Sequence, residues 1–241
     1  MTRLEEAPAV ANLSQDLSCD LSCPSCRTKV LKLREYNTRR LDSLVNADYV
    51  AFLSEVANVT ISPKGEPFAS EHFLRLLSEY CRKAVRKKAL HLQTNGLLLT
   101  EELWNRLDLW GHVHSVRISV DAASPRVYET LKRGGRFDRL IPNLMFLGQL
   151  RRLDALEDFR LTFLVQSANL EEMPGFVRLA RHVGADGAVF QRLCDWGTYG
   201  AAGFSERDVV SASHPQHFEF RKMVEDPVLR GPDIDLEAIL P

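Results

Sequence analysis

The sequence has no long apolar run and almost no net charge, and each absence excludes a class of protein. No stretch approaches the roughly 20 apolar residues of a membrane-spanning helix, and the residues after Met1 lack a signal peptide's apolar core. Basic residues number 31 and acidic residues 32, which argues against nucleic acid or an acidic membrane as the main partner. One basic run, residues 82–88, fits the solvated end of a helix. We expect a cytoplasmic protein that binds neither nucleic acid nor membrane.

Cysteine is also scarce, and it is unevenly placed. Of five cysteines, Cys19, Cys23 and Cys26 fall within eight residues, whereas Cys81 and Cys194 stand alone. This distribution shows neither a disulfide framework nor the second half of a structural zinc site. Thiols that bind metal suit a reducing cytoplasm.

The C-x3-C-x2-C spacing of the three clustered cysteines indicates an iron–sulfur site. Three thiolates can hold three irons of a [4Fe–4S] cube and leave the fourth iron open, whereas four thiolates would close the cube and suit it to electron transfer. An open corner can chelate a small molecule. We therefore predict a cluster at Cys19, Cys23 and Cys26; a zinc site and ordinary core thiols are the alternatives.

Strand and helix patterns alternate along the chain, which is typical of a parallel α/β fold. Helical spacing of apolar residues appears at 73–80, 140–150 and 176–183, and Cys81 belongs to the core side of the first of these helices. Beyond residue 200 we expect a loop to 213, a last helix over 214–225 and an extended tail. The expected strands are residues 10–17, 58–62, 89–93, 115–120, 159–165 and 187–191.

Five short segments together resemble the radical S-adenosylmethionine (radical SAM) superfamily. The likeness covers roughly residues 12–200 and is closest to the branch that carries a C-terminal SPASM or twitch domain, common among peptide-modifying enzymes. Its segments, in family order, are Leu17–Arg27, Gly65-Glu66-Pro67, Gln93–Gly96, Ser119-Val120-Asp121 and Gln191-Arg192-Leu193.

The resemblance implies an open, partial TIM-like (β/α)6 barrel, and six β/α units are indeed two short of a closed barrel. We expect residues 1–200 to form this barrel with the cluster and SAM sites, and residues 201–241 to pack on it as a loop, helix and tail. The motifs follow expected strands, and ligands bind such sheets at the carboxyl ends of the strands.

The resemblance also assigns SAM contacts. Gly65, Glu66 and Pro67 would accept hydrogen bonds from the methionine amino group, largely through backbone carbonyls, although Lys64 replaces a common glycine. Arg133 would bind the methionine carboxylate, with Lys132 as the competing choice. An ordinary turn and a solvated charge pair are the plainer interpretations.

Further candidates lie at the ends of later strands. Period two places Ser119 and Asp121 on one side of a strand, where a hydroxyl and a carboxylate suit a ribose diol or an amino-acid headgroup. Thr94 and Asn95 form a turn that could contact SAM. Amides and guanidinium groups that could contact adenine, ribose or substrate, or simply cap backbone groups, are Gln166, Gln191 and Arg192.

Cys194 follows the sixth expected strand and is a candidate hydrogen-atom donor to a substrate radical; a small apolar filler is the alternative. No cysteine follows it in this chain, so an auxiliary cluster is not expected here. That favours a redox-neutral outcome such as epimerisation or rearrangement.

The function that follows is a radical SAM enzyme with a [4Fe–4S] cluster and SAM as cofactors. An external one-electron reductant of the flavodoxin or ferredoxin class would reduce the cluster, and the substrate would be a peptide or a small natural product. The alternatives are a catalytically decayed binding subunit, a simple iron–sulfur electron carrier and, most remotely, a metal-free hydrolase.

Overall fold

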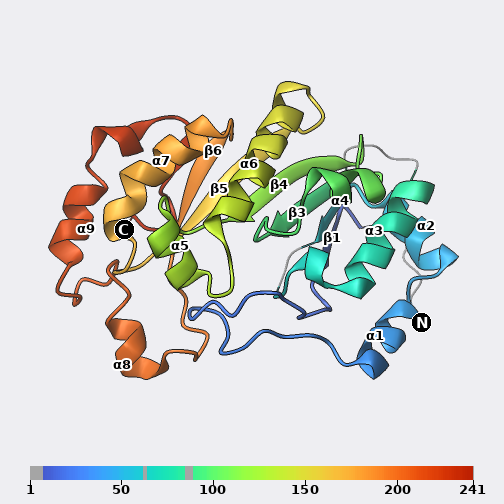
Figure 1. Ribbon diagram of the computed structural model, residues 1–241, viewed down its shortest axis with the longest axis horizontal. Coiled ribbons are helices and arrows are strands. Elements are labelled where there is room, and N and C mark those ends of the chain that lie inside the picture. The colour runs from blue at the N-terminus through green and yellow to red at the C-terminus, as the bar shows by residue number, and fades with distance from the viewer. Residues whose placement is uncertain (1–7, 62–63, 85–88, 241) are drawn as a thin grey trace.

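A single parallel sheet organises the computed structural model, which describes residues 8–61, 64–84 and 89–240. Within these residues seven strands follow one another in sequence order, and the first and last strands are edges, so the sheet is open (Figure 1). This confirms the expected α/β fold and open partial barrel. The strands are β1 (Val10–Leu13), β2 (Asn58–Ile61), β3 (Leu90–Thr94), β4 (Val113–Ser119), β5 (Asp158–Val165), β6 (Gly187–Arg192) and β7 (Ile234–Asp235).

The six predicted strands are all present, with shifted ends. β1 stops at Leu13 instead of residue 17, and residues 62–63, where the second strand was expected to end, lie outside the described part. β7 was not predicted as a strand. It comes from the tail, where Ile234 and Asp235 pair with Ala188 and Val189 of β6.

Helices cover the sheet, and the three predicted from apolar spacing are confirmed as α3, α6 and α7. The last helix is present but shorter than the predicted 214–225. The prediction of a loop over 200–213 was wrong at the start of that range, where α8 lies. The described helices are α1 (Glu35–Asp42), α2 (Ala47–Glu55), α3 (Glu71–Lys83), α4 (Glu101–Arg106), α5 (Pro125–Leu131), α6 (Phe137–Arg152), α7 (Met173–His182), α8 (Gly200–Ser205) and α9 (His217–Met223), with 3₁₀ turns η1 (Pro67–Ala69), η2 (Leu170–Glu172) and η3 (Pro227–Arg230).

The predicted helix faces are buried as their spacing requires. Leu140, Leu144, Leu147 and Leu150 of α6 are at most 1% exposed, and Cys81 of α3 is in the core. A Cβ at Gly148 of α6 would overlap the Val183 carbonyl oxygen, so glycine allows α6 to approach the end of α7.

The basic run at the end of α3 is only partly described. Arg82 and Lys83 form ion pairs with Glu79, while residues 85–88 lie outside the described part. Within the described ranges, none of the helices combines the length and apolarity that crossing a bilayer requires.

Candidate cofactor site

The cysteine loop follows β1 and is fixed by its own backbone. The amides of Cys26 and Arg27 both donate to the Cys23 carbonyl at 2.9 Å, which closes a tight turn. Cys19 exchanges two backbone hydrogen bonds with Leu31, at 2.7 and 3.2 Å, so the strand-like return of the chain holds the first cysteine. All three thiols are free; Cys19 and Cys23 are half-buried, and Cys26 is exposed.

Gly65 packs directly against this loop. A Cβ at this position would lie 2.5 Å from the Ser18 carbonyl oxygen and 2.8 Å from that of Asp16, so only glycine fits without displacing the backbone. The next amide, that of Glu66, donates to the same Ser18 oxygen at 2.6 Å. The Gly-Glu-Pro segment after β2 is thereby joined to the cysteine loop after β1.

Arg27 makes a second connection between the two segments. Its guanidinium donates to the carbonyl oxygens of Leu17, at 3.0 Å, and Lys64, at 2.5 Å, and lies 3.5 Å from the Cys26 sulfur. The Gly-Glu-Pro segment was proposed for its backbone carbonyls, and this connection sets their position relative to the thiols.

Burial determines the charge state of the free thiols. It raises the pKa of Cys19 to about 12 and also raises that of Cys23, although the nearby Lys132 ammonium opposes the shift at Cys23. Without metal these thiols are protonated at neutral pH. Iron would displace the protons, because thiolate is the ligand form.

The donor set fits an iron–sulfur cluster. Three thiols lie on one short loop, and each would bind a different iron of a cube, which leaves one corner open. Among the described residues, no group of three or more His, Cys, Asp or Glu side chains is placed to hold a single metal ion. A cube spreads its thiolates over three irons, so this finding concerns single-ion sites such as zinc and does not count against the cluster.

Glu66 is turned inward and joins the ends of β2 and β3. Its carboxylate accepts hydrogen bonds from the Thr94 hydroxyl at 2.6 Å, the Asn95 amide at 2.7 Å and the Phe68 amide at 3.2 Å. Asn95 in turn donates from its side chain to Asp20 in the cysteine loop at 2.8 Å. The side chains of Thr94 and Asn95 therefore hold the site together, and their contact with SAM stays a prediction.

Ser119 and Asp121 lie on one side of the strand end, as period two predicted, and both contact Lys132. The Lys132 ammonium is 2.6 Å from the Asp121 carboxylate and 2.7 Å from the Ser119 hydroxyl. Burial disfavours the ammonium, but the neighbouring Asp121 carboxylate more than compensates, so the pKa of Lys132 is raised. The second Asp121 oxygen accepts from the Leu164 amide at 2.8 Å, so both oxygens have protein partners.

Arg133 differs from its neighbour. Its side chain is exposed and lines a cavity of about 630 Å³ beside the cysteine loop, while its carbonyl accepts from the Ser22 amide at 3.0 Å. Of the two candidates for binding a carboxylate, Arg133 is the one whose guanidinium faces open space, because Lys132 is 5% exposed and paired.

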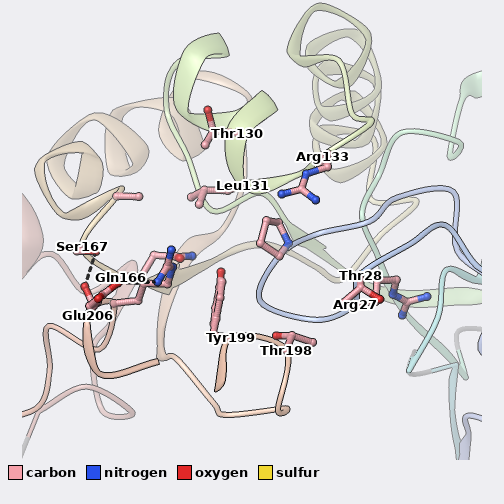
Figure 2. A pocket seen from close by; sticks show the side chains of 13 residues that line it. Arg27, Thr28, Thr130, Leu131, Arg133, Gln166, Ser167, Thr198, Tyr199 and Glu206 are labelled. Carbon is pink, nitrogen blue, oxygen red and sulfur yellow. Dashed lines mark hydrogen bonds and ion pairs between the residues drawn. The ribbon is translucent and has the colours of Figure 1, made fainter. Parts of the chain in front are cut away.

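Gln166 and Thr198 line the cavity, and the Gln166 side-chain oxygen and the Thr198 hydroxyl are buried without a hydrogen-bond partner among the described residues. Figure 2 shows Arg133 on one side of the cavity, Tyr199 and Thr198 opposite it, and Arg27 and Thr28 at one end. The Tyr199 ring is held by the Arg207 guanidinium, 4.4 Å from its centre. The exposed Arg133 guanidinium gives this cavity a cation that could pair with an anionic group of a ligand.

The remaining candidates lie outside this cavity's lining. Gln191 is exposed, and Arg192 is bound to Asp208 at 2.7 Å. Cys194 is exposed, with its sulfur 3.8 Å from the Arg192 carbonyl oxygen. Their roles toward SAM or substrate stay predictions.

The sequence interpretation missed the part of the cavity that follows β6. Thr198, Tyr199, Glu206 and Arg207 come from or flank α8, a segment expected to be loop. Gly197 and Gly200, both at positive φ, stand on either side of Thr198 and Tyr199. These two glycines were the local sequence feature that could have indicated an ordered turn there.

Comparison with known proteins gives a consistent result. The model of the Radical SAM superfamily matches residues 17–172. The probable GTP 3',8-cyclase of Methanocaldococcus jannaschii is 25% identical over 174 residues, covering 69% of this chain and 53% of the relative. The chain thus spans about half the length of this curated relative.

Solved structures share the fold. SuiB of Streptococcus suis bound to S-adenosylmethionine has a TM-score of 0.59 at 16% identity, over 91% of this chain and 47% of SuiB. SuiB bound to precursor peptide SuiA has a TM-score of 0.54 at 16% identity, over 78% and 40%. TsrM of Kitasatospora setae with cobalamin and a [4Fe-4S] cluster has a TM-score of 0.51 at 16% identity, over 76% and 34%.

Proposed function

We propose that this chain, which belongs to the radical SAM superfamily, cleaves SAM reductively and abstracts a hydrogen atom from its substrate. It is a radical SAM enzyme whose cofactors are a [4Fe–4S] cluster and SAM. One observation carries the proposal. The three-cysteine loop packs tightly against Gly65, beside a cavity lined by Gln166 and Thr198, whose buried side-chain oxygens have no partner within the described part of the chain.

When bound, the cofactors would supply the difficult chemistry, which is the one-electron cleavage of a C–S bond of SAM. The chain's residues bind and orient. Cys19, Cys23 and Cys26 hold the cluster; Arg133 binds the methionine carboxylate, and backbone carbonyls of Gly65 to Pro67 accept from the amino group. Gln166 and Thr198 offer hydrogen bonds to the adenosine part.

We propose a peptide or a small natural product as the substrate. The likeness to SuiB with precursor peptide SuiA supports a peptide, whereas the relative named as a GTP cyclase supports a small molecule. Ser119, Asp121, Gln191 and Arg192 stand at the same edge of the sheet and are the residues we propose to face cofactor or substrate. A redox-neutral outcome would return a hydrogen atom from Cys194, whose exposed thiol lies just beyond β6.

The test is an anaerobic assay of the reconstituted protein with SAM and dithionite, with methionine and 5′-deoxyadenosine as products. Cys23→Ala is expected to abolish both products, and Cys194→Ala to leave them unchanged. Equal product from wild type and Cys23→Ala would refute the proposal. With a candidate peptide or GTP deuterated at carbon, transfer of deuterium into 5′-deoxyadenosine identifies the substrate class.

A further inference from the structure

A strongly basic surface segment follows the cysteine loop, although the whole chain has a net charge of −1. We define the basic segment as residues 27–40. It contains one acidic residue, Glu35, which forms an ion pair with Arg39. Apart from Arg27, its basic side chains are exposed to solvent. They are Lys29, Lys32, Arg34, Arg39 and Arg40.

The basic segment is attached to the residues that hold the cluster. Leu31 is bonded to Cys19 through the backbone, and the Leu33 amide donates to the Ser18 hydroxyl at 2.9 Å. Arg27 contacts the sulfur of Cys26, the exposed member of the three cysteines. Positive charge therefore flanks the side of the cluster loop that is open to solvent.

Apolar side chains are exposed within the same region. Leu17 is 41% exposed, Val30 49% and Tyr36 76%. Apolar groups surrounded by charged ones are the composition of a protein–protein contact, with Tyr and Arg the residue types enriched there. A polyanion such as RNA would use the arginines and lysines but leave Val30 and Leu17 without partners.

Figure 1 places α1, which begins within the basic segment, on the opposite side of the molecule from α8 and α9. The basic segment begins at the cavity, which Arg27 and Thr28 line, and runs from there to α1. A partner on its α1 end would therefore leave uncovered the part of the cavity that α8 contributes.

We infer that the basic segment is the docking surface of a small acidic protein that carries one electron on a flavin or an iron–sulfur centre. The inference rests on the proposed function, which requires such a donor. One electron passes from the donor, which is oxidised, to the cluster, which is reduced, and no bond is made. Opposite charges at this surface raise the rate of encounter and orient the donor toward the exposed cysteine.

The test compares two electron sources for one reaction. The double variant Lys29→Glu/Lys32→Glu reverses two exposed charges of the basic segment. The control variant, Arg221→Glu/Arg230→Glu, makes the same charge change on η3 and on α9, which Figure 1 places on the opposite side of the molecule from α1. SAM cleavage is measured with a reduced acidic flavodoxin at low salt, and separately with dithionite. Flavodoxin binding to the reconstituted protein is measured by titration calorimetry.

We expect the variant in the basic segment to lose about tenfold or more in flavodoxin-driven kcat/KM and in flavodoxin affinity, because encounter between opposite charges is steered electrostatically. Its dithionite-driven rate should be unchanged, and the control variant should match wild type with both donors. Salt should slow the wild type with flavodoxin far more than it slows the variant.

Three results would overturn the inference: equal loss in the two double variants, equal loss with the two electron sources, or tighter binding of a single-stranded RNA than of flavodoxin. Absence of SAM cleavage by wild type with dithionite would refute the proposed function instead, and the binding titration would still decide whether the basic segment is a docking surface.

Discussion

Replacing the buried charged residues near the cysteine loop has consequences for stability that can be predicted one residue at a time. Lys132 and Asp121 are 5% and 4% exposed, and their ion pair lies beneath the site. Lys132→Met leaves the Asp121 carboxylate buried without its cation, which we expect to cost about 3–5 kcal/mol in the free energy of unfolding. Denaturant unfolding of the variant and wild type measures this cost.

The matched control is the double variant Asp121→Asn/Lys132→Met. Asparagine tolerates the positive φ of 65° at position 121 and keeps an oxygen for the Leu164 amide. It should recover most of the lost stability. A double variant as unstable as Lys132→Met would show that packing, and not the unpaired charge, sets the cost.

Glu66 gives the protein a pH-dependent stability of defined sign. Burial raises the pKa of the Glu66 carboxyl from an ordinary 4.5 to about 7, and the Asp20 charge adds to this rise. The hydrogen bonds donated by Thr94, Asn95 and Phe68 oppose it. The folded state binds the Glu66 proton more tightly than the unfolded state does. Protonation therefore stabilises the fold by about 3 kcal/mol, fully below pH 4.5, and this stabilisation is lost as the pH rises through 7.

The measurement is the urea midpoint of the metal-free protein at pH 5 and at pH 7.5, for wild type and for Glu66→Gln. The wild type should lose more stability between these pH values than the variant, whose side chain does not titrate. Identical losses would contradict the assignment of this pH dependence to Glu66.

At the scale of elements, the spacing of apolar residues predicted the strands and helices that bury one face. It missed the elements that form only through contact with residues far away in the sequence. Leu140 to Leu150 repeat at helical spacing, so α6 could be predicted from its own residues. β7 has two residues and exists because β6 offers an unpaired edge. The cavity-lining turn at Thr198 and Tyr199 likewise depends on the Arg207 contact.

The same division applies to the candidate site. The cysteine spacing predicted the thiol loop, and period two predicted that Ser119 and Asp121 share a side. Lys132 binds both of these side chains, and the Gln166 oxygen finds no partner among the described residues. Both facts depend on how the loops after β4 and β5 pack. Such pairing between loops leaves no periodic trace in the sequence.

The end of β5 offers a direct test of the proposal that this cavity binds SAM. Gln166→Met preserves side-chain length and removes the buried oxygen for which the described residues provide no partner. Unfolding stability should be unchanged or higher, because an unsatisfied polar group is lost, whereas the SAM dissociation constant should rise about tenfold if that oxygen accepts a hydrogen bond from SAM. Gln149→Met on the exposed face of α6 is the matched control. Unchanged SAM affinity in Gln166→Met would remove Gln166 from the cofactor site.

At the scale of the whole molecule, the open sheet gathers the ends of its strands along one edge, and there the cysteine loop, the Gly-Glu-Pro segment and the cavity meet. Although the chain is nearly neutral, exposed cations gather beside the cysteine loop, whereas Lys132, paired with Asp121, is buried.

The measurement that tests this account most directly is electron paramagnetic resonance of the anaerobically reconstituted, dithionite-reduced protein, with and without SAM. We predict the signal of a reduced [4Fe–4S] cluster that changes when SAM is added, since three cysteines leave one iron free to bind it. A cluster signal indifferent to SAM, or no cluster signal at all, would contradict the account.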